Sequence, residues 1–573
     1  MSKTLITVGL LAAAVMPVAA APARPNVLIV ITDDQGYGDL GCHGNPILKT
    51  PNLDAFAKES VQLTHFHVSP VCSPTRSSLL TGRYNYRTGV IDTFVGRSMM
   101  HADEVTLAEM LRDAGYRTGL FGKWHLGDNY PLRPQDQGFQ EVLTLRGGGL
   151  AQPSDPPGGG SYSDPILFHN GKMKKCAGYV TDVLTDAAID FVARKTDEPF
   201  FAYVAYNCPH SPYQVQDADW KPYKGIDLGP DTFPKVGSAW STKKLNQEEI
   251  GKAYGMIANI DMNFARLLGK VPENTLVVFL TDNGPGGVRW NAGLRNRKGT
   301  TYDGGIRVPF YVRWPGQLAA GRKVDTPSAH IDITPTVLEA CRVVPPKGVA
   351  FDGRSVVPLL KGEKVDWPER HLFFQWHRGD LPEMGRAFAA RGPRYKLVQA
   401  AGVQVGKFEP KEELFDIPND PFEEKDLAAE KPDVVRDLHE SYEAWFKDVK
   451  ATRNFQGPRI HLGSDKENPT VLTRQDWRGP NAGWTAESIG HWDVTVERAG
   501  TYRITVDFEP SKEQRTVTVQ LGDRKQGTEL PAGKTRVVFE RLTLTKGEGK
   551  LEALVEGEKR AGPTFVEVER VGD

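Results

Sequence analysis

The feature that most constrains the fold lies between about Pro25 and Leu360, where short apolar runs rich in β-branched residues alternate with helical segments. This alternation favours an α/β domain with a large, mostly parallel sheet flanked by helices. The expected strands are Asn26 to Thr32, Arg117 to Phe121, Phe200 to Tyr206, Leu276 to Thr281 and Phe310 to Trp314. The expected helices are Pro51 to Glu59, Thr106 to Ala114, Glu248 to Leu268 and Pro335 to Cys341, the last with Thr334 as its N-cap.

Polar residues of catalytic type follow the first four of these expected strands. Asp33 and Asp34 follow the first, Lys123 and His125 the second, His210 the third, and Asp282 and Asn283 the fourth. Each group alone is also typical of a turn or a helix cap. In open α/β sheets, however, ligands bind beyond the carboxyl ends of the strands, so the shared placement predicts one convergent site.

The acidic members of this set indicate a metal site. Asp33, Asp34, Asp282 and Asn283 all offer oxygen ligands. A hard cation such as Ca²⁺ or Mg²⁺ prefers oxygen, whereas Zn²⁺ prefers histidine or cysteine. The sequence therefore predicts a calcium or magnesium site formed by residues from distant parts of the chain.

Length and charge limit the function classes that need to be considered. A chain of 573 residues is too long for a single core, and roughly 100 to 200 residues per domain predicts two to four units. The net charge of -1 gives no sign of the basic surface that nucleic-acid binding requires. Any attraction for an anionic substrate must therefore be local.

The N-terminus has the pattern of an export signal over residues 1–21. Lys3 precedes an apolar run from Leu5 to Met16, and small residues follow up to Ala21. The apolar run is shorter than the about 20 residues that span a bilayer, so we expect no membrane span in the mature chain and a periplasmic or secreted protein. Cys42, Cys176, Cys208 and Cys341 could form two disulfides, but the sequence assigns no pair.

The run CSPTRSSLLTGR, from Cys72 to Arg83, carries the most specific chemical information. On its own it predicts a helix start, with Ser73 as the N-cap and Pro74 at the first helical position. The full run also resembles the signature at which sulfatases convert one cysteine into formylglycine. Three further segments resemble motifs of that family: GKWHLG at Gly122 to Gly127, NCPHSP with His210, and RNRKGTTYDGGIRVP with Lys298.

The resemblance covers about residues 25–450 and implies the alkaline-phosphatase-like fold of sulfatases, sulfate-ester hydrolysis, and a formylglycine at position 72 made by a formylglycine-generating enzyme. It assigns a cation, Ca²⁺ first and Mg²⁺ second, to Asp33, Asp34, Cys72 after modification, Asp282 and Asn283. It assigns catalytic roles to Cys72, Arg76, Lys123, His125, His210 and Lys298. Lys298 is chosen over Arg295 and Arg297 by its spacing to YDGGIRVP.

The mechanism that the resemblance implies uses a hydrated aldehyde at position 72 as the nucleophile. Asp282 takes a proton from one hydroxyl of the hydrate, and the resulting alkoxide attacks sulfur. The side chains of Arg76, Lys123 and Lys298 surround the negative sulfate oxygens during this attack. His210 protonates the departing alcohol. His125 then takes the proton of the second hydroxyl, so that the aldehyde re-forms and sulfate leaves.

Beyond residue 365 the chain predicts further units. Residues 366–450 resemble the small C-terminal α+β subdomain of sulfatases, with a short antiparallel sheet and a terminal helix. Residues 451–484 are expected to form a linker, and the alternating pattern of 485–573 predicts an antiparallel β-sandwich that resembles carbohydrate-binding modules. The sequence allows two interpretations of Trp477, Trp484 and Trp492: they stack on sugar rings, or they pack in a core or between domains. A Gly- and Pro-rich loop from Arg146 to Pro165 is expected to be mobile and to lie near the mouth of the site.

Three hypotheses about function follow. An exported enzyme with a sugar-binding appendage favours a sulfated saccharide as substrate, with aryl sulfates also accepted. The first alternative is a phosphomonoester or phosphonate hydrolase of the same superfamily; the two-zinc enzymes of that kind use histidine ligands, which the predicted metal positions lack. The second alternative is a noncatalytic glycan-binding protein, which the intact set of catalytic residue types disfavours.

Overall fold

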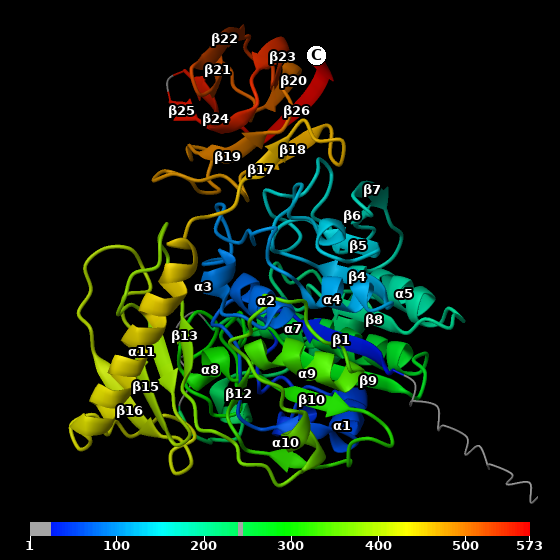
Figure 1. Cartoon of the computed structure of the whole chain (residues 1–573), viewed down its shortest axis with the longest axis vertical. Helices are drawn as coiled ribbons and strands as arrows, with labels where there is room; N and C mark the ends of the chain where they lie inside the picture. Colours follow the sequence, from blue (N-terminus) through cyan, green and yellow to red (C-terminus); the bar gives the residue numbers. More distant parts are fainter. Residues whose placement is uncertain (1–23, 239–244, 558) are drawn as a thin grey trace, which may run out of the picture.

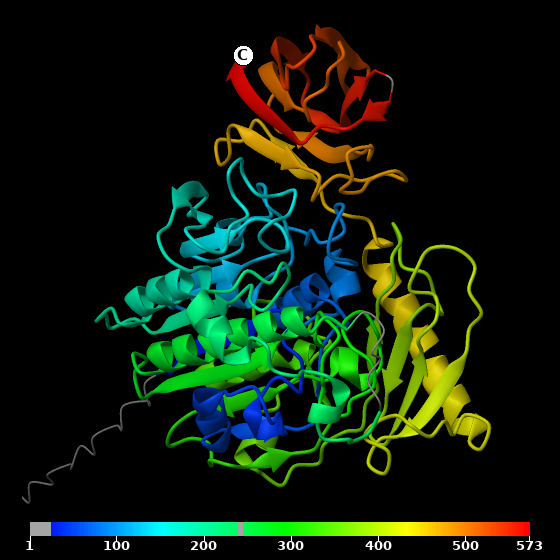
Figure 2. The ribbon, with the colours of Figure 1, turned by 180° about the vertical axis from the view of Figure 1, so that it is seen from behind.

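The computed structural model describes residues 24–238, 245–557 and 559–573, so the predicted signal peptide lies outside the described residues. Figure 1 shows an α/β body, a small sheet beside the long helix α11, and a β-sandwich at the C-terminal end. Figure 2 shows the same arrangement from behind, with the sandwich seated on the body instead of standing away from it.

A ten-stranded sheet in the order β11-β2-β10-β9-β1-β8-β4-β5-β6-β7 forms the centre of the body. Its strands are β1 Asn26–Thr32, β2 Val61–Leu63, β4 Arg117–Lys123, β5 Glu141–Leu145, β6 Ile166–His169, β7 Lys172–Lys175, β8 Phe200–Ala205, β9 Thr275–Thr281, β10 Phe310–Arg313 and β11 Lys323–Val324. The run from β9 through β1, β8 and β4 to β5 is parallel, whereas β10 is antiparallel to β9. The five predicted strands are thus confirmed and lie side by side.

Helices cover both faces of this sheet. The longer ones are α1 Pro51–Lys58, α2 Cys72–Thr81, α4 Leu107–Asp113, α5 Val180–Val192, α7 Gln247–Leu268 and α9 Ile333–Cys341; short helices are α3 Asn85–Thr88, α6 Asp217–Trp220, α8 Asp303–Ile306 and α10 Val357–Lys361. Alternate residues of β1 face opposite clusters, with Ile29 among residues of α2, α4 and α9 and Val30 among residues of α1, α5 and α7. Burial on both faces explains the continuously apolar sequence of this strand.

Two helix starts differ from the sequence prediction. Helix α9 begins at Ile333, so Thr334 lies inside it and donates its hydroxyl to the Leu79 carbonyl at 2.7 Å instead of capping the helix. Helix α2 begins at Cys72, with Val71 at the N-cap, so Ser73 is a helical residue and not the cap. At α9 a tertiary contact thus overrides the local capping preference, whereas the Ser73 hydroxyl is buried without a hydrogen-bond partner.

The C-terminal subdomain has the predicted α+β form. The strands β13 Leu372–Gln375, β14 Phe388–Arg391, β15 Tyr395–Gln399 and β16 Glu412–Asp416 form an antiparallel sheet, and α11 Pro432–Arg453 packs against it. A buried ion pair fixes the subdomain to the body, because the Lys396 ammonium lies 2.6 Å from Asp303 of the body; the same ammonium also lies 2.7 Å from Glu423 of the subdomain itself. All three side chains are fully buried.

The β-sandwich is larger than the sequence predicts. One sheet contains β17 Ile460–Leu462, β19 His491–Val496, β21 Arg515–Leu521, β22 Arg524–Leu530 and β24 Gly547–Glu556, with β25 Arg560–Ala561 at its side; the other contains β18 Thr470–Thr473, β20 Gly500–Asp507, β23 Arg536–Leu544 and β26 Phe565–Gly572. Because β17 and β18 lie in the expected linker and pair with these sheets, the prediction of a linker over residues 451–484 is wrong for that part.

The three tryptophans of this region do not form a common sugar-stacking face. Trp477 and Trp492 are fully buried in the sandwich core. Trp484 is partly exposed, and its ring packs edge-on against Phe94 of the body, with the ring centroids 5.4 Å apart. The second interpretation therefore holds, with core packing for Trp477 and Trp492 and packing against the body for Trp484.

No described helix is long and apolar enough to cross a membrane. The five cysteines, all within the described residues, are free thiols, so none of the pairs allowed by the sequence forms here.

Candidate active site

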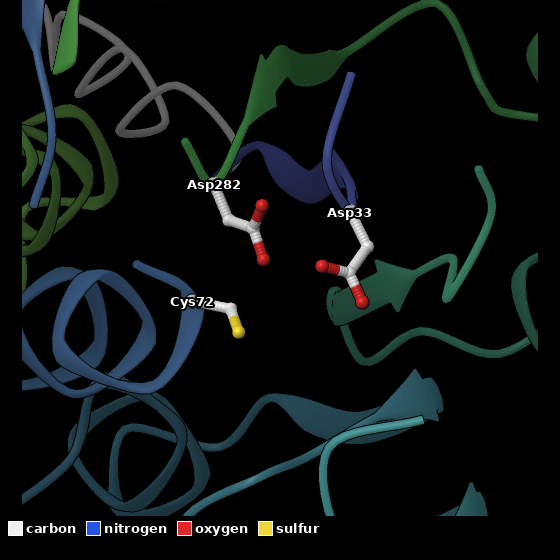
Figure 3. Close-up of side chains that lie close together, drawn as sticks. All are labelled: Asp33, Cys72 and Asp282. Atoms are coloured by element: carbon white, nitrogen blue, oxygen red, sulfur yellow. The ribbon is translucent and has the colours of Figure 1, made fainter. Parts of the chain in front are cut away.

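The predicted site residues converge at the carboxyl ends of β1, β4, β8 and β9, facing the N-terminus of α2. Figure 3 shows the side chains of Asp33, Cys72 and Asp282 pointing into a common space. The Cys72 sulfur and one carboxylate oxygen from each aspartate lie within 4.8 Å of one another. The prediction that distant strand ends bring these residue types together is therefore met by the geometry.

Cys72 occupies the first position of α2, which is buried along its whole length. Burial raises the pKa of its thiol, although Lys123 and Lys298 act in the opposite direction. The residue is 2% exposed, and the position at a helix N-terminus favours negative charge on whatever binds there.

Arg76 lies one helical turn after Cys72 and links two parts of the site. Its guanidinium donates to Asp282 Oδ2 at 2.7 Å and to the Lys123 carbonyl at 3.1 Å. Both Arg76 and Asp282 are fully buried. Burial and the neighbouring Asp33 raise the pKa of Asp282 to about 6, while Arg76 acts to lower it.

Lys123 and Lys298 each contact one of the paired aspartates that follow β1. Lys123 Nζ lies 2.6 Å from Asp33 Oδ2, with both side chains fully buried. Lys298 Nζ donates to Asp34 Oδ1. Burial alone would raise the pKa of Asp34, but Lys298 and His210 outweigh it and hold that pKa well below its ordinary range.

The backbone at Asp34 is left-handed, with φ of 63°. This conformation lets its N–H donate to Asp282 Oδ1 at 3.1 Å while its carboxylate accepts from Asn283 Nδ2 at 2.8 Å. A non-glycine residue in this region carries strain, which concentrates at functional sites. The turn thereby gathers the oxygen atoms of three residues from two strand ends.

These oxygens fit a hard cation. Asp33 Oδ1 and Asn283 Oδ1 are both buried and have no hydrogen-bond partner. A buried polar atom without a hydrogen-bond partner is costly, and ion binding at that atom offsets the cost. The donor set consists of carboxylate and amide oxygens, which suits Ca²⁺ or Mg²⁺ better than Zn²⁺.

The two predicted histidines have different surroundings. His125 has a positive φ of 61°, and its Nε2 lies 2.7 Å from the Thr93 carbonyl. Burial and Lys123 lower the pKa of His125 well below its ordinary value. His210 Nδ1 lies 2.5 Å from the Ser211 carbonyl and Nε2 lies 3.8 Å from Asp34 Oδ2; burial lowers its pKa to about 4, although Asp34 acts to raise it.

The glycine-rich loop that follows β5 lies against both histidines, as expected from the sequence. A Cβ at Gly148 would come within 2.5 Å of the His125 ring, and one at Gly149 would lie 3.3 Å from His210 Nδ1. Leu150 is fully buried, so the loop is packed at the site and does not stand open. Glycine is thus required here by close approach.

Sequence reasoning missed Arg289, which supports the strained turn. Its guanidinium donates to the Asp34 carbonyl at 2.6 Å and is paired with Asp39 at 2.7 Å. It also missed Asn207, a buried side chain whose oxygen and nitrogen both lack partners. Its position one residue before Cys208 in the NCPHSP segment was the available signal, whereas no pattern marks Arg289.

Comparisons with solved structures define the class of protein. The chain is similar to the "Crystal structure of Ps i-CgsB in complex with k-i-k-neocarrahexaose", with a TM-score of 0.64, 27% identity, and coverage of 76% of this chain and 95% of that one. It also resembles the phosphonate monoester hydrolase of Agrobacterium radiobacter in fold, with a TM-score of 0.53, 22% identity, and coverage of 75% and 96%. The fold is the alkaline-phosphatase-like fold.

Sequence comparisons then identify the family. The sulfatase family model matches residues 25–343, and the model "N-sulphoglucosamine sulphohydrolase, C-terminal" matches residues 296–448. Human (Homo sapiens) arylsulfatase A is 33% identical over 411 residues, with coverage of 66% of this chain and 75% of that protein. N-acetylgalactosamine-6-sulfatase of Canis lupus familiaris is 31% identical over 404 residues, with coverage of 65% and 72%. The chain belongs to the sulfatase family and is a sulfuric ester hydrolase, which confirms the resemblance stated above.

Proposed function

We propose that this sulfatase removes sulfate from a sulfated glycan through a formylglycine at position 72, and that it also accepts aryl sulfates. The observation that carries the proposal is the placement of Cys72 at a helix N-terminus beside two buried carboxylates. Burial raises the pKa of the thiol, so an unmodified cysteine is a poor nucleophile here. Conversion of the thiol into an aldehyde hydrate gives this position a hydroxyl nucleophile instead.

Asp33, Asp34, Asp282 and Asn283 would hold the cation, with Ca²⁺ as the first choice and Mg²⁺ as the second. The unpartnered oxygens of Asp33 and Asn283 support this assignment. When bound, the ion supplies positive charge that polarises the sulfate group and orients the nucleophile.

The charged side chains around Cys72 account for the first chemical step. Asp282, with a carboxylate oxygen within 4.8 Å of the Cys72 sulfur, is the proposed acceptor of the proton from the nucleophilic hydroxyl. Arg76, Lys123 and Lys298 supply fixed positive charge for the sulfate oxygens. Their ion pairs, fully buried for Arg76 and Lys123, hold them in place before substrate arrives, so little reorganisation is needed during the reaction.

The histidines account for the remaining proton transfers. His210 is the proposed acid for the departing alcohol. Its Nδ1 already carries the proton that it donates to the Ser211 carbonyl. To protonate the alcohol from Nε2, the ring must carry a second proton and therefore be an imidazolium. The negative charge of an incoming sulfate favours that charged form. His125 is the proposed base in the step that releases sulfate, since Nε2 donates to Thr93 and leaves Nδ1 without a partner.

The substrate class and location rest on the sequence and on the relatives. The N-terminal pattern favours a periplasmic or secreted enzyme, and a formylglycine-generating enzyme is the expected maturation partner. Ps i-CgsB binds a neocarrahexaose, and a second relative is named for N-acetylgalactosamine 6-sulfate chemistry. Both names support a saccharide sulfate as the substrate of this chain.

The proposal is tested on the full chain made in a host that contains the maturation enzyme. Mass spectrometry of the peptide with residue 72 should show formylglycine, and hydrolysis of an aryl sulfate should greatly exceed that of the matching aryl phosphate. A panel of defined sulfated saccharides then identifies the sugar. Active protein whose residue 72 is wholly unmodified cysteine, or a preference for phosphate, overturns the proposal.

A further inference from the structure

The β-sandwich core extends into the body. Val95, Met99 and Leu132 of the body are buried in the same hydrophobic cluster as the sandwich strands. Polar contacts accompany this packing, because the Gly96 N–H donates to the Gln475 carbonyl at 2.8 Å and Arg478 donates to the Gly96 carbonyl. The segment from Thr93 to Met99 therefore packs against, and is hydrogen-bonded to, residues of the sandwich region.

The same segment provides the hydrogen-bond acceptor for His125. A carbonyl oxygen can only accept, so the 2.7 Å contact between His125 Nε2 and the Thr93 carbonyl requires a proton on Nε2. The buried ring is neutral and carries one N–H, so Nδ1 holds a free lone pair and is the basic atom. The position of the Thr93 carbonyl thus selects which nitrogen of His125 can accept a proton.

Gln475 donates a second hydrogen bond to the same carbonyl. Its Nε2 donates to the Thr93 carbonyl at 3.0 Å and to Ser98 Oγ at 3.1 Å, and the residue is 1% exposed. Two donors therefore converge on one oxygen, one from the body and one from the β-sandwich region. Without the amide of Gln475, the Thr93 carbonyl would be free to rotate away from the His125 ring.

We propose that the β-sandwich is part of the catalytic unit and that Gln475 is a positioning residue, which fixes the Thr93 carbonyl and thereby the tautomer and orientation of His125. The inference rests on the proposed role of His125 in the sulfate-releasing step. In that step the proton passes from the hydroxyl of residue 72 to Nδ1, the bond from residue 72 to the sulfate oxygen breaks with its electron pair leaving on sulfate, and the C=O bond re-forms.

Kinetics of the matured full chain distinguish this role from a general loss of stability. Gln475→Met and Gln475→Glu keep the side-chain size but remove the donor. We expect kcat and KM for an aryl sulfate to fall together by roughly 10-fold or more, with kcat/KM nearly unchanged, because only the step after alcohol departure is slowed. A burst of the aryl alcohol, stoichiometric with enzyme, should then precede the steady state.

Two matched variants serve as controls. Ser98→Ala removes the second contact of Gln475 and leaves the contact with Thr93. Asn129→Leu removes a comparable amide-to-carbonyl bond across the same interface, from Asn129 Nδ2 to the Val471 carbonyl at 3.0 Å, without touching Thr93. Both should keep kcat within about twofold and show no burst. Wild-type rates in the folded Gln475 variants, or an equal effect in Asn129→Leu, overturn the inference.

A second readout does not depend on maturation or turnover. In the full chain with unmodified Cys72, ¹⁵N NMR of histidine-labelled protein, assigned with His125→Asn, should show one His125 tautomer protonated at Nε2. In Gln475→Met and Gln475→Glu the two ring nitrogen signals should move toward each other, as the tautomers mix. An unchanged spectrum refutes the role of Gln475, whereas an inactive wild type with the expected spectra refutes only the proposed function.

Discussion

The cluster around Cys72 and the core of the β-sandwich are both buried, but they treat polar groups in opposite ways. In the cluster, Lys123 and Arg76 form fully buried ion pairs with Asp33 and Asp282, and oxygen atoms remain without partners. Along the strands of the sandwich the buried side chains are mainly apolar, and the buried indole of Trp492 donates to the Thr473 carbonyl at 2.8 Å. Buried charge is weak evidence for stability. The comparison teaches that the cluster is organised for chemistry and the sandwich for packing.

The largest effect should come from Cys72→Ser, which leaves the shape of the cluster nearly intact. In a host that does not modify serine, we expect steady-state sulfatase activity to fall by on the order of 10⁴-fold or more, because the hydroxyl that expels sulfate is missing. The thermal midpoint of the sandwich should not change. Sustained turnover by protein whose residue 72 is shown to be serine would contradict the formylglycine assignment.

Cation removal should have the next largest effect and should separate the two regions. A chelator is expected to lower activity by about 100-fold or more, with recovery on adding Ca²⁺, because the carboxylates then lose the charge that balances them. Asp33→Asn should raise the Ca²⁺ concentration needed for recovery. Elemental analysis must confirm that the chelated protein is metal-free. Full activity of such protein would rule out the proposed cation site.

Replacing His210 tests its role as the acid for the departing alcohol. His210→Gln should slow desulfation of a sugar by roughly 100-fold, yet slow a nitrophenyl sulfate only a few-fold, since a phenolate leaves without protonation. Arg87→Lys, on an ion pair with Asp352 outside the cluster, provides a control that should treat both substrates alike. Equal losses on sugar and aryl substrates for His210→Gln would show that it does not protonate the alcohol.

The sequence predicted those parts of the fold that a local pattern determines. Continuous apolar runs identified the parallel strands, since β1 is buried on both faces, and strict alternation identified the sandwich strands such as β20. Because Asp33 and Asp282 each follow the end of a strand, the sequence also predicted that they lie at one site. The roles assigned to individual residues, however, came from the resemblance of short motifs to a family and not from periodicity.

The sequence could not predict features that depend on contacts between distant segments. Thr334 looks like a cap, but its hydroxyl is used by the Leu79 carbonyl of another helix. Strand β17 has only three residues and pairs with a strand more than 30 positions later, so local composition resembled a linker. Arg289 and Gln475 act on carbonyl oxygens of distant segments, and no spacing rule identifies such contacts.

Acid should destabilise the body through its buried histidines. Burial lowers the pKa of His67 to about 4 and that of His330 to about 3, from an ordinary 6.5. Below pH 6.5 the unfolded chain binds protons that the folded chain does not, so the free energy of unfolding should fall as pH drops toward 4, by ~1.4 kcal/mol per pH unit for each histidine. Hydrogen exchange at pH 6.5 and 5 should show the loss in the body strands, and His330→Asn should reduce it. Equal protection at both pH values would contradict neutral burial.

The smallest effect should come from replacing Trp484, the residue at which ring packing and sugar binding remain to be told apart. Its partly exposed ring contacts Phe94 edge-on, so Trp484→Ala should lower the free energy of unfolding by about 1 kcal/mol and leave retention on a sulfated polysaccharide unchanged. Phe94→Leu should lower stability to a similar degree, because it removes the same ring pair. If Trp484→Ala weakened polysaccharide binding at least tenfold while Phe94→Leu did not, the indole would be binding sugar instead of joining the two regions.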